Sequence, residues 1–277
     1  MNGWIYNQHM VEALIPDVWQ YIIDYLDLCS QLNLMSTCKS LRGFYIHSIK
    51  HDESVMIKPE SLNFALKLPK FDKLTSLCLY GLYGGKTIGY NFIQLKLTSL
   101  NMIGGQLTGL ENITGLLALS LSSVMLSNSQ IINSDLLRLD IYDSGWANID
   151  KLTKLTYLRC NQRSTTTFKR APLLELNISH YNSHWDKLSK LTRLTKLTLH
   201  LPDNVTNISN MQLVELSLIG GTTRLITVDR ITTLTGLTVL HCAVSYEGPK
   251  LRNLCVCRCL KIKADSSPFL TVVECHH

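Results

Sequence analysis

Apolar residues recur along most of this chain in one short pattern, apolar-x-x-apolar-x-apolar, which first appears at Leu74, Leu77 and Leu79 and returns about every 20 residues. The later copies are Leu97/Leu100/Met102, Leu116/Leu119/Leu121, Leu136/Leu139/Ile141, Leu155/Leu158/Cys160, Leu173/Leu176/Ile178, Leu194/Leu197/Leu199, Leu213/Leu216/Leu218, Leu237/Leu240/Cys242, Leu251/Leu254/Val256 and, more weakly, Leu270/Val273/Cys275. The final two-residue step is the period of a β-strand, and the three-residue step before it suits a tight turn or a 3₁₀ segment. Each copy therefore predicts a turn followed by a short strand.

A single copy is too short to bury its own apolar side. Copies stacked in chain order bury theirs against their neighbours, which is the organisation of a solenoid. In every other copy extra apolar residues precede the pattern, as at Leu188 and Leu191 ahead of Leu194. We expect about eleven irregular coils, each giving one strand to a parallel sheet and returning through an extended or 3₁₀ segment.

This repeat resembles leucine-rich repeats, whose consensus is L-x-x-L-x-L-x-x-N/C-x-L with a period of about 20 to 29 residues. The family has an Asn or Cys three residues after the strand, but here that position holds residues such as Val124 and Ser144, and only Cys259 fits. We therefore expect irregular coils in which other groups satisfy the backbone of the turns.

The start of the chain follows a helical spacing instead. Apolar residues recur at that spacing at Leu14, Ile15, Val18, Ile22, Ile23 and Leu26, and a second group follows at Leu32, Leu34, Met35 and Cys38. Pro16 and Asp17 suit a helix start. These residues predict amphipathic helices with more apolar surface than about 35 residues can bury. The surface either caps the first coil of the solenoid or binds a partner.

The residue order of this helical module resembles the F-box. The F-box motif begins with a leucine–proline pair and ends on a short [SC]-[KR] element; Ile15-Pro16 and Cys38-Lys39 are the counterparts here, with Ile15 in place of the usual leucine. F-box proteins dock through this module onto the small adaptor subunit of SCF (Skp–cullin–F-box) ubiquitin ligases, and their C-terminal repeats hold a substrate. Carried over by position, the resemblance implies an adaptor-facing surface of Ile15, Pro16, Val18, Ile22, Leu26 and Leu32.

Together these patterns predict an α/β protein with three parts. A helical F-box-like module occupies residues 11–44, a helical linker residues 45–67, and a leucine-rich-repeat solenoid with a parallel concave sheet residues 68–277. In the linker, Pro59 suits the start of a helix.

Residues that alternate with the buried strand positions point to the concave face of the predicted sheet. In the middle copies they are Arg138, Asp140, Tyr142, Tyr157, Arg159, Glu175, Asn177, Lys196 and His200. Tyr and Arg most often carry interface energy, so we expect a protein substrate to bind here. Asp140 with Arg159, and Glu175 with Lys196, also suit cross-strand pairs that only neutralise a solvated sheet.

Composition narrows the classes of function. The net charge of +6 is spread over 277 residues without a Lys/Arg run, which argues against nucleic-acid binding. No apolar run reaches membrane-span length and no leader is evident, so we expect neither membrane insertion nor secretion. The nine cysteines are then expected to be reduced, in the cytoplasm or the nucleus.

Two kinds of chemistry are disfavoured. Cys255, Cys257 and Cys259 have the residue type of zinc ligands, but paired zinc cysteines usually have two to four residues between them, whereas these have one, and Cys259 lies beyond the strand. No residue spacing indicates a phosphate loop or a nucleophile with its base. We therefore expect no metal, no cofactor and no catalysis in this chain.

The sequence thus predicts a non-catalytic substrate-recognition adaptor of an SCF-type ubiquitin ligase. Its partners would be the Skp-type adaptor subunit, the cullin of the complex and a protein substrate that the sequence does not identify. One alternative is a repeat scaffold outside any ligase, with a helical N-terminal cap. A second is a secreted or surface recognition protein, which would require disulfides and glycosylated sequons.

Overall fold

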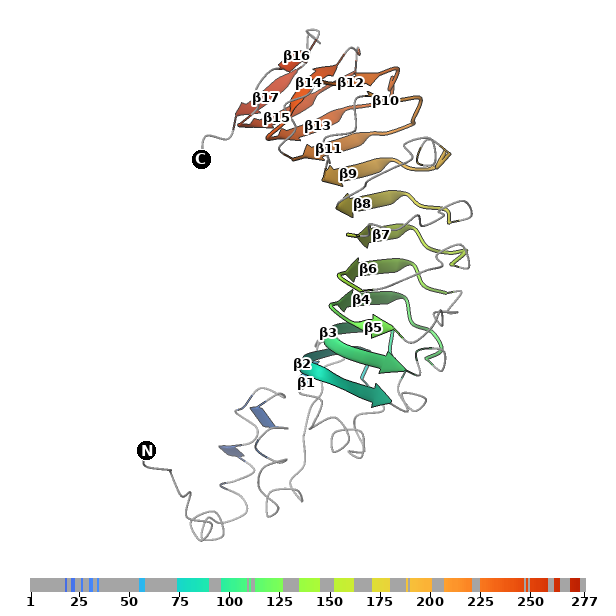
Figure 1. Ribbon diagram of the computed structural model, residues 1–277, viewed down its shortest axis with the longest axis vertical. Coiled ribbons are helices and arrows are strands. Elements are labelled where there is room, and N and C mark those ends of the chain that lie inside the picture. Colours follow the sequence, from blue (N-terminus) through green and yellow to red (C-terminus); the bar gives the residue numbers. More distant parts are fainter. Residues whose placement is uncertain are drawn as a thin grey trace. The chain divides into compact units, whose positions relative to one another are not determined.

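The computed structural model describes the chain over residues 18, 21–22, 26, 30–31, 34, 55–57, 74–89, 96–108, 110, 113–126, 135–144, 152–161, 171–179, 188, 190–200, 207–220, 225–246, 248, 250–258, 262–264 and 270–274. The chain forms two compact units, Met1–Leu116 and Leu117–His277. Parallel strands dominate the described part of each (Figure 1).

The first unit contains β1 (Val55–Ile57), β2 (Ser76–Gly89) and β3 (Ser99–Thr108), paired in parallel in that order. β1 lies within the stretch that we predicted as a helical linker, and that prediction is wrong for these three residues; the rest of residues 45–67 lies outside the described residues. Val55 and Ile57 are β-branched, which favours a strand, and they pair with Leu77 and Leu79 of β2. The parallel sheet therefore begins one copy earlier than predicted.

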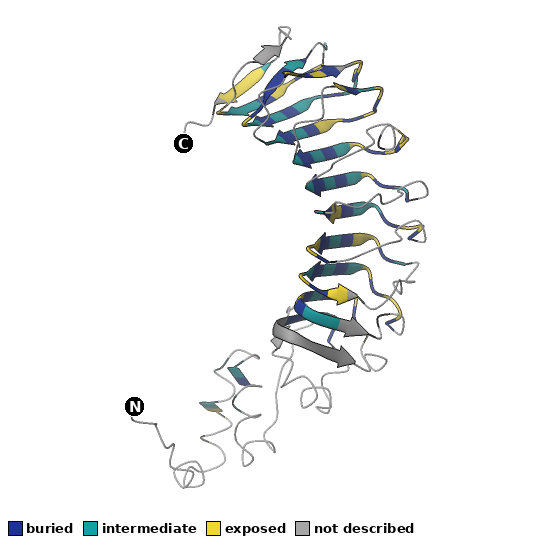
Figure 2. Cartoon of the chain, in the orientation of Figure 1, coloured by how far each residue is buried: buried dark blue, intermediate teal, exposed yellow. Residues whose placement is uncertain are grey.

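The second unit carries a parallel sheet whose strands follow chain order as β4-β6-β7-β8-β9-β11-β13-β15-β17 (Figure 1). The strands are β4 (Ala118–Ser122), β6 (Arg138–Tyr142), β7 (Tyr157–Cys160), β8 (Glu175–Ser179), β9 (Lys196–His200), β11 (Glu215–Ile219), β13 (Gly236–Leu240), β15 (Asn253–Cys257) and β17 (Thr271–Glu274), with the short β5 (Met125–Leu126) after β4. Burial alternates along β4, β6, β8, β9, β11 and β13 (Figure 2), whereas Val272 and Val273 of β17 are both exposed. In β9, Leu197 and Leu199 are buried while the residues between them are half-exposed, which confirms the predicted period of two.

The C-terminal coils contain a second parallel sheet that the sequence reading missed. Its strands are ordered β10 (Asn207–Ser209), β12 (Leu225–Asp229), β14 (Ala243–Tyr246) and β16 (Ile262–Ala264). We expected one strand per copy, and this is wrong for these coils; the return is extended, as one of our two expected forms, and is itself a paired strand. Ile226 and Val228 of β12 are buried and β-branched, so these return segments have their own strand pattern. The core here lies between two sheets.

The strand register corrects two copies of the repeat. In the weak last copy, which we placed at Leu270, Val273 and Cys275, β15 pairs Leu254 with Val272 and Val256 with Glu274, so our register there was off by one residue. The other correction concerns the copy around Leu237. We assigned Leu237, Leu240 and Cys242 to one copy, but β11 pairs Leu218 with Val239 and Val239 is fully buried, so the copy ends at Val239. Cys242 is therefore not a strand residue and lies at the Asn/Cys position of the repeat. It is buried there, and its thiol donates to the Leu218 carbonyl across 3.6 Å. This copy fits the leucine-rich-repeat consensus better than we predicted.

Ser144 shows how a turn without Asn or Cys is satisfied. Its buried hydroxyl accepts a hydrogen bond from the Val124 N–H of the preceding coil at 2.9 Å and donates to the Tyr142 carbonyl at 3.0 Å. One hydroxyl thereby links two coils. Another group does replace the amide ladder here, as we expected.

Replacing Ser144 by alanine is expected to lower the free energy of unfolding by about 1–3 kcal/mol, because the buried Val124 N–H loses its acceptor. Urea unfolding followed by circular dichroism measures the change. The matched control is Ser120→Ala on the half-exposed face of β4, which should cost less than about 0.5 kcal/mol. Equal losses in the two variants would show that the Ser144 bridge contributes little.

Candidate functional site

The strand register gathers the predicted substrate residues on one face of neighbouring strands β6, β7, β8 and β9. One row across these strands holds Arg138, Tyr157, Glu175 and Lys196, a second holds Asp140, Arg159 and Asn177, and Tyr142 and His200 lie at strand ends. We call these nine residues the middle face. That they bind a substrate stays a prediction.

Arg138 and Tyr157 form a stacked pair in the first row. The guanidinium carbon of Arg138 lies 3.8 Å from the centroid of the Tyr157 ring, which is cation–π geometry. Burial raises the pKa of Tyr157 above its ordinary value, against the opposing effect of Arg138, so the phenol is a protonated donor at neutral pH. The pair presents two interface-prone side chains in one fixed arrangement.

Asp140 and Arg159 form a loose ion pair in the second row. The Arg159 Nη1 lies 3.9 Å from the Asp140 Oδ2. Burial raises the pKa of Asp140, and the lowering effects of Arg159 and Arg138 do not offset it. Because a guanidinium carries five N–H donors and the Arg159 side chain is half-exposed, this contact leaves Arg159 donors for a ligand.

The raised pKa of Asp140 gives a pH prediction. The folded state binds this proton more tightly than the unfolded state does, so the contribution of Asp140 to stability is greatest at acid pH and is lost as pH rises through the folded-state pKa. Asp140→Asn should therefore gain in stability, relative to the wild type, between pH 3 and pH 7. Urea unfolding at both pH values tests this, and a relative loss at pH 7 would show that the pair with Arg159 outweighs burial.

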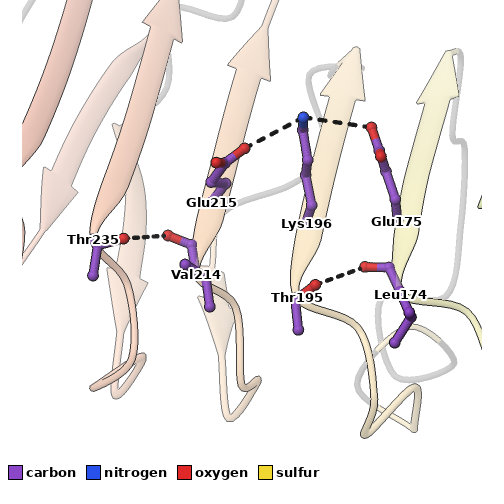
Figure 3. A network of polar contacts seen from close by, with 7 residues as sticks. All are labelled: Leu174, Glu175, Thr195, Lys196, Val214, Glu215 and Thr235. Atoms are coloured by element: carbon purple, nitrogen blue, oxygen red, sulfur yellow. Dashed lines mark hydrogen bonds and ion pairs between the residues drawn. The ribbon is translucent and has the colours of Figure 1, made fainter.

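Lys196 bridges two carboxylates in the first row (Figure 3). Its Nζ lies 3.5 Å from Glu175 and 3.3 Å from Glu215. The hydrogen bond to Glu215, followed by the charges of Glu175 and Glu215, raises the pKa of Lys196. Glu215 was not among our predicted site residues, although it is the first residue of β11 and occupies the same row. Exposed pairs of this kind contribute about 0–1 kcal/mol each.

Asn177 carries an unsatisfied group at the centre of the middle face. Its side-chain oxygen is buried, with no hydrogen-bond partner in the described part of the chain. Such an acceptor costs about 1–3 kcal/mol.

A separate row of side chains lies beside the middle face, one residue before each strand (Figure 3). We call it the rim row: Leu137, Thr156, Leu174, Thr195, Val214 and Thr235. Each threonine hydroxyl donates to the carbonyl of the aliphatic residue on the preceding coil, at 3.2 Å for Thr156, 3.1 Å for Thr195 and 3.3 Å for Thr235. The aliphatic members are exposed by 38 to 41%.

The predicted adaptor-facing surface is described in part. Val18 is 40% exposed and the neighbouring Tyr21 is 62% exposed, while Ile22 and Leu26 are half-buried. The remaining predicted residues, Ile15, Pro16 and Leu32, lie outside the described residues. Tyr21 was not among the predicted residues, because our motif comparison treated its position as variable. Apolar surface is thus open to solvent in this segment, as a partner site requires.

The helical form of this module stays a prediction. Val18, Tyr21, Ile22 and Gln31 have helical backbone, but the described residues delimit no complete helix. At the bend at Leu26, the Gln31 side-chain amide donates to the Leu26 carbonyl at 2.8 Å.

The described residues contain neither a metal-binding cluster nor a membrane-spanning helix. No group of three or more His, Cys, Asp or Glu side chains is arranged there to hold a metal ion. None of the helical segments among them is long and apolar enough to cross a bilayer.

Comparison with known proteins identifies the N-terminal module. Residues 12–44 match the F-box domain, which confirms the predicted F-box. No curated protein matches the chain. Among solved structures, an internalin (inlF) from Listeria monocytogenes is similar at a TM-score of 0.32 and 12% sequence identity, over 73% of this chain and 80% of the internalin chain.

Proposed function

We propose, from the F-box domain at residues 12–44, that this chain is the substrate-recognition subunit of an SCF-type ubiquitin ligase. The observation that carries the proposal is the F-box followed by a parallel-strand solenoid with a charged and aromatic face. In this role the chain recruits the substrate, and the other subunits of the ligase transfer ubiquitin. This role places it in the cytoplasm or the nucleus.

The adaptor side of the proposal rests on exposed apolar groups in the F-box. Val18 and Tyr21 leave apolar surface in contact with water, and burying it against a partner is favourable by about 25 cal/mol per Å². An F-box binds the Skp-type adaptor subunit, which links it to the cullin. Ile22 and Leu26, which belong to the predicted adaptor-facing surface, are half-buried.

The target side rests on the middle face. Cross-strand pairing holds its backbone in register over β6 to β9, so a partner meets an ordered surface and little ordering entropy is lost. Arg138 stacked on Tyr157 supplies the anchor types that dominate protein interfaces.

Affinity purification of the tagged chain from its native cells, followed by mass spectrometry, tests the proposal. We expect a Skp-type adaptor and a cullin at near-stoichiometric amounts, together with at least one protein that accumulates when the proteasome is inhibited. Recovery of partners without adaptor or cullin would support the alternative, a repeat scaffold outside any ligase.

A further inference from the structure

Aliphatic and charged side chains occur together on alternate strands of the solenoid. Leu137 precedes Arg138 on β6, Leu174 precedes Glu175 on β8, and Val214 precedes Glu215 on β11. On the strands between them, the rim position holds threonine. The rim row and the first row of the middle face, extended by Glu215, therefore repeat an aliphatic–charged pair every second strand (Figure 3).

The spacing of these pairs favours one backbone conformation for a peptide bound across the strands. Neighbouring strands are about 4.8 Å apart, so the aliphatic side chains recur about every 9.6 Å along the stack. A polyproline-II segment has three residues per turn and rises about 3.1 Å per residue, which places every third side chain on one face about 9.3 Å apart. An extended peptide running across the strands therefore matches the spacing with an apolar residue at every third position.

The order of charges along the middle face also predicts the direction in which a peptide would bind. On β6 and β7, Arg138 and Arg159 outnumber Asp140, whereas on β8 to β11 the carboxylates of Glu175 and Glu215 share the single ammonium of Lys196. One end of the face therefore has an excess of cations and the other an excess of anions.

We propose that the rim row and the middle face together bind an extended segment of the target protein with apolar residues three positions apart, an acidic residue over Arg138 and basic residues over Glu175 and Glu215. This inference rests on the proposed function, because it describes the target that the solenoid captures. Such a segment buries the exposed aliphatic side chains and meets each charge excess with its opposite.

Lys196 has an unusual role under this proposal, because it competes with the basic residues of the segment for the same two carboxylates. Replacing it by glutamine frees both. Lys196→Gln should therefore bind the segment about two- to fivefold more tightly than wild type, the range that an exposed ion pair supplies.

Selection from a displayed library of random 12-residue peptides tests the inference, using the full chain in complex with its adaptor subunit. On wild type we expect enrichment of peptides with apolar residues three apart, acidic toward one end and basic toward the other. On the charge-reversed variant Arg138→Glu/Glu175→Lys/Glu215→Lys the order of acid and base along the peptides should reverse. Affinity of the best wild-type peptide for Lys196→Gln is measured by calorimetry as an independent readout.

Three outcomes overturn the inference: no charge order in the enriched peptides, the same order on both proteins, or weaker binding by Lys196→Gln. Adaptor binding in the same preparations separates this failure from failure of the proposed function. If the adaptor is retained and the charge order is absent, only the nature of the target segment is wrong. If the adaptor does not bind the wild-type chain, the proposed function itself fails.

Discussion

Replacing Ile22 by aspartate together with Pro16 by alanine is expected to abolish co-purification of the Skp-type adaptor, a loss of at least about 100-fold in affinity. Ile22 is half-buried close to the exposed Val18 and Tyr21. An aspartate there must either lose its water in the interface or hold the partner away, and an unpaired buried charge costs several kcal/mol. A pull-down with purified adaptor measures the loss.

The fold of this variant is checked through its solenoid. Circular dichroism should show that the strand content and melting temperature of the second unit are unchanged, since the substitutions lie in the first unit. A second variant, Val18→Glu, alters a side chain that is already 40% exposed and so carries less risk to folding. The matched control is Lys154→Ala, which removes an exposed ion pair to Asp135. Full retention of the adaptor by both F-box variants would reject the adaptor-binding role.

The parallel coils could be predicted from the sequence because the recurring leucines can be buried only if the coils stack on one another. A strand of five residues with two buried leucines, such as β9, is stable only if neighbouring strands cover those leucines. Strict alternation also assigns each remaining residue to a face, which is why the nine middle-face residues were found without a structure.

The register of the copy around Leu237 could not be read in the same way. Leu234, Leu237 and Leu240 are equally spaced, so the pattern fits at two positions three residues apart. Only the pairing of Val239 with Leu218 decides between them. Equal spacing removes the information that fixes register, and pairing with the neighbouring strand restores it.

Some side-chain contacts of the middle face could not be predicted from the sequence for a related reason. Alternation places Glu215 on the correct face, but its bond to Lys196 depends on the register between β9 and β11. The stacking of Arg138 on Tyr157 likewise requires both the register and the rotamers. The sequence predicts which residues lie on the middle face, but the contacts between their side chains depend on cross-strand geometry.

Replacing Arg138, Tyr157 and Arg159 together by alanine is expected to abolish target capture while leaving the fold and adaptor binding intact. The stacked pair and the partly engaged Arg159 are the interface-prone side chains of the middle face, and truncating a true anchor costs about 2–4 kcal/mol. Two such anchors correspond to a loss of about three orders of magnitude or more in affinity. The core is spared because it consists of the alternate residues of the same strands, such as Leu139 and Leu158.

The control for this triple variant removes exposed residues of similar size away from the middle face. Lys154, Lys190 and Arg193 are exposed and lie in the turns before β7 and β9, so their replacement by alanine changes charge without touching the sheet. Quantitative mass spectrometry of proteins co-purified with each variant and with wild type gives the readout. Because the proposed adaptor site is the F-box and these substitutions lie outside it, adaptor recovery serves as an internal standard. A middle-face variant that keeps every wild-type partner would place target binding elsewhere, with the C-terminal coils as the next region to test.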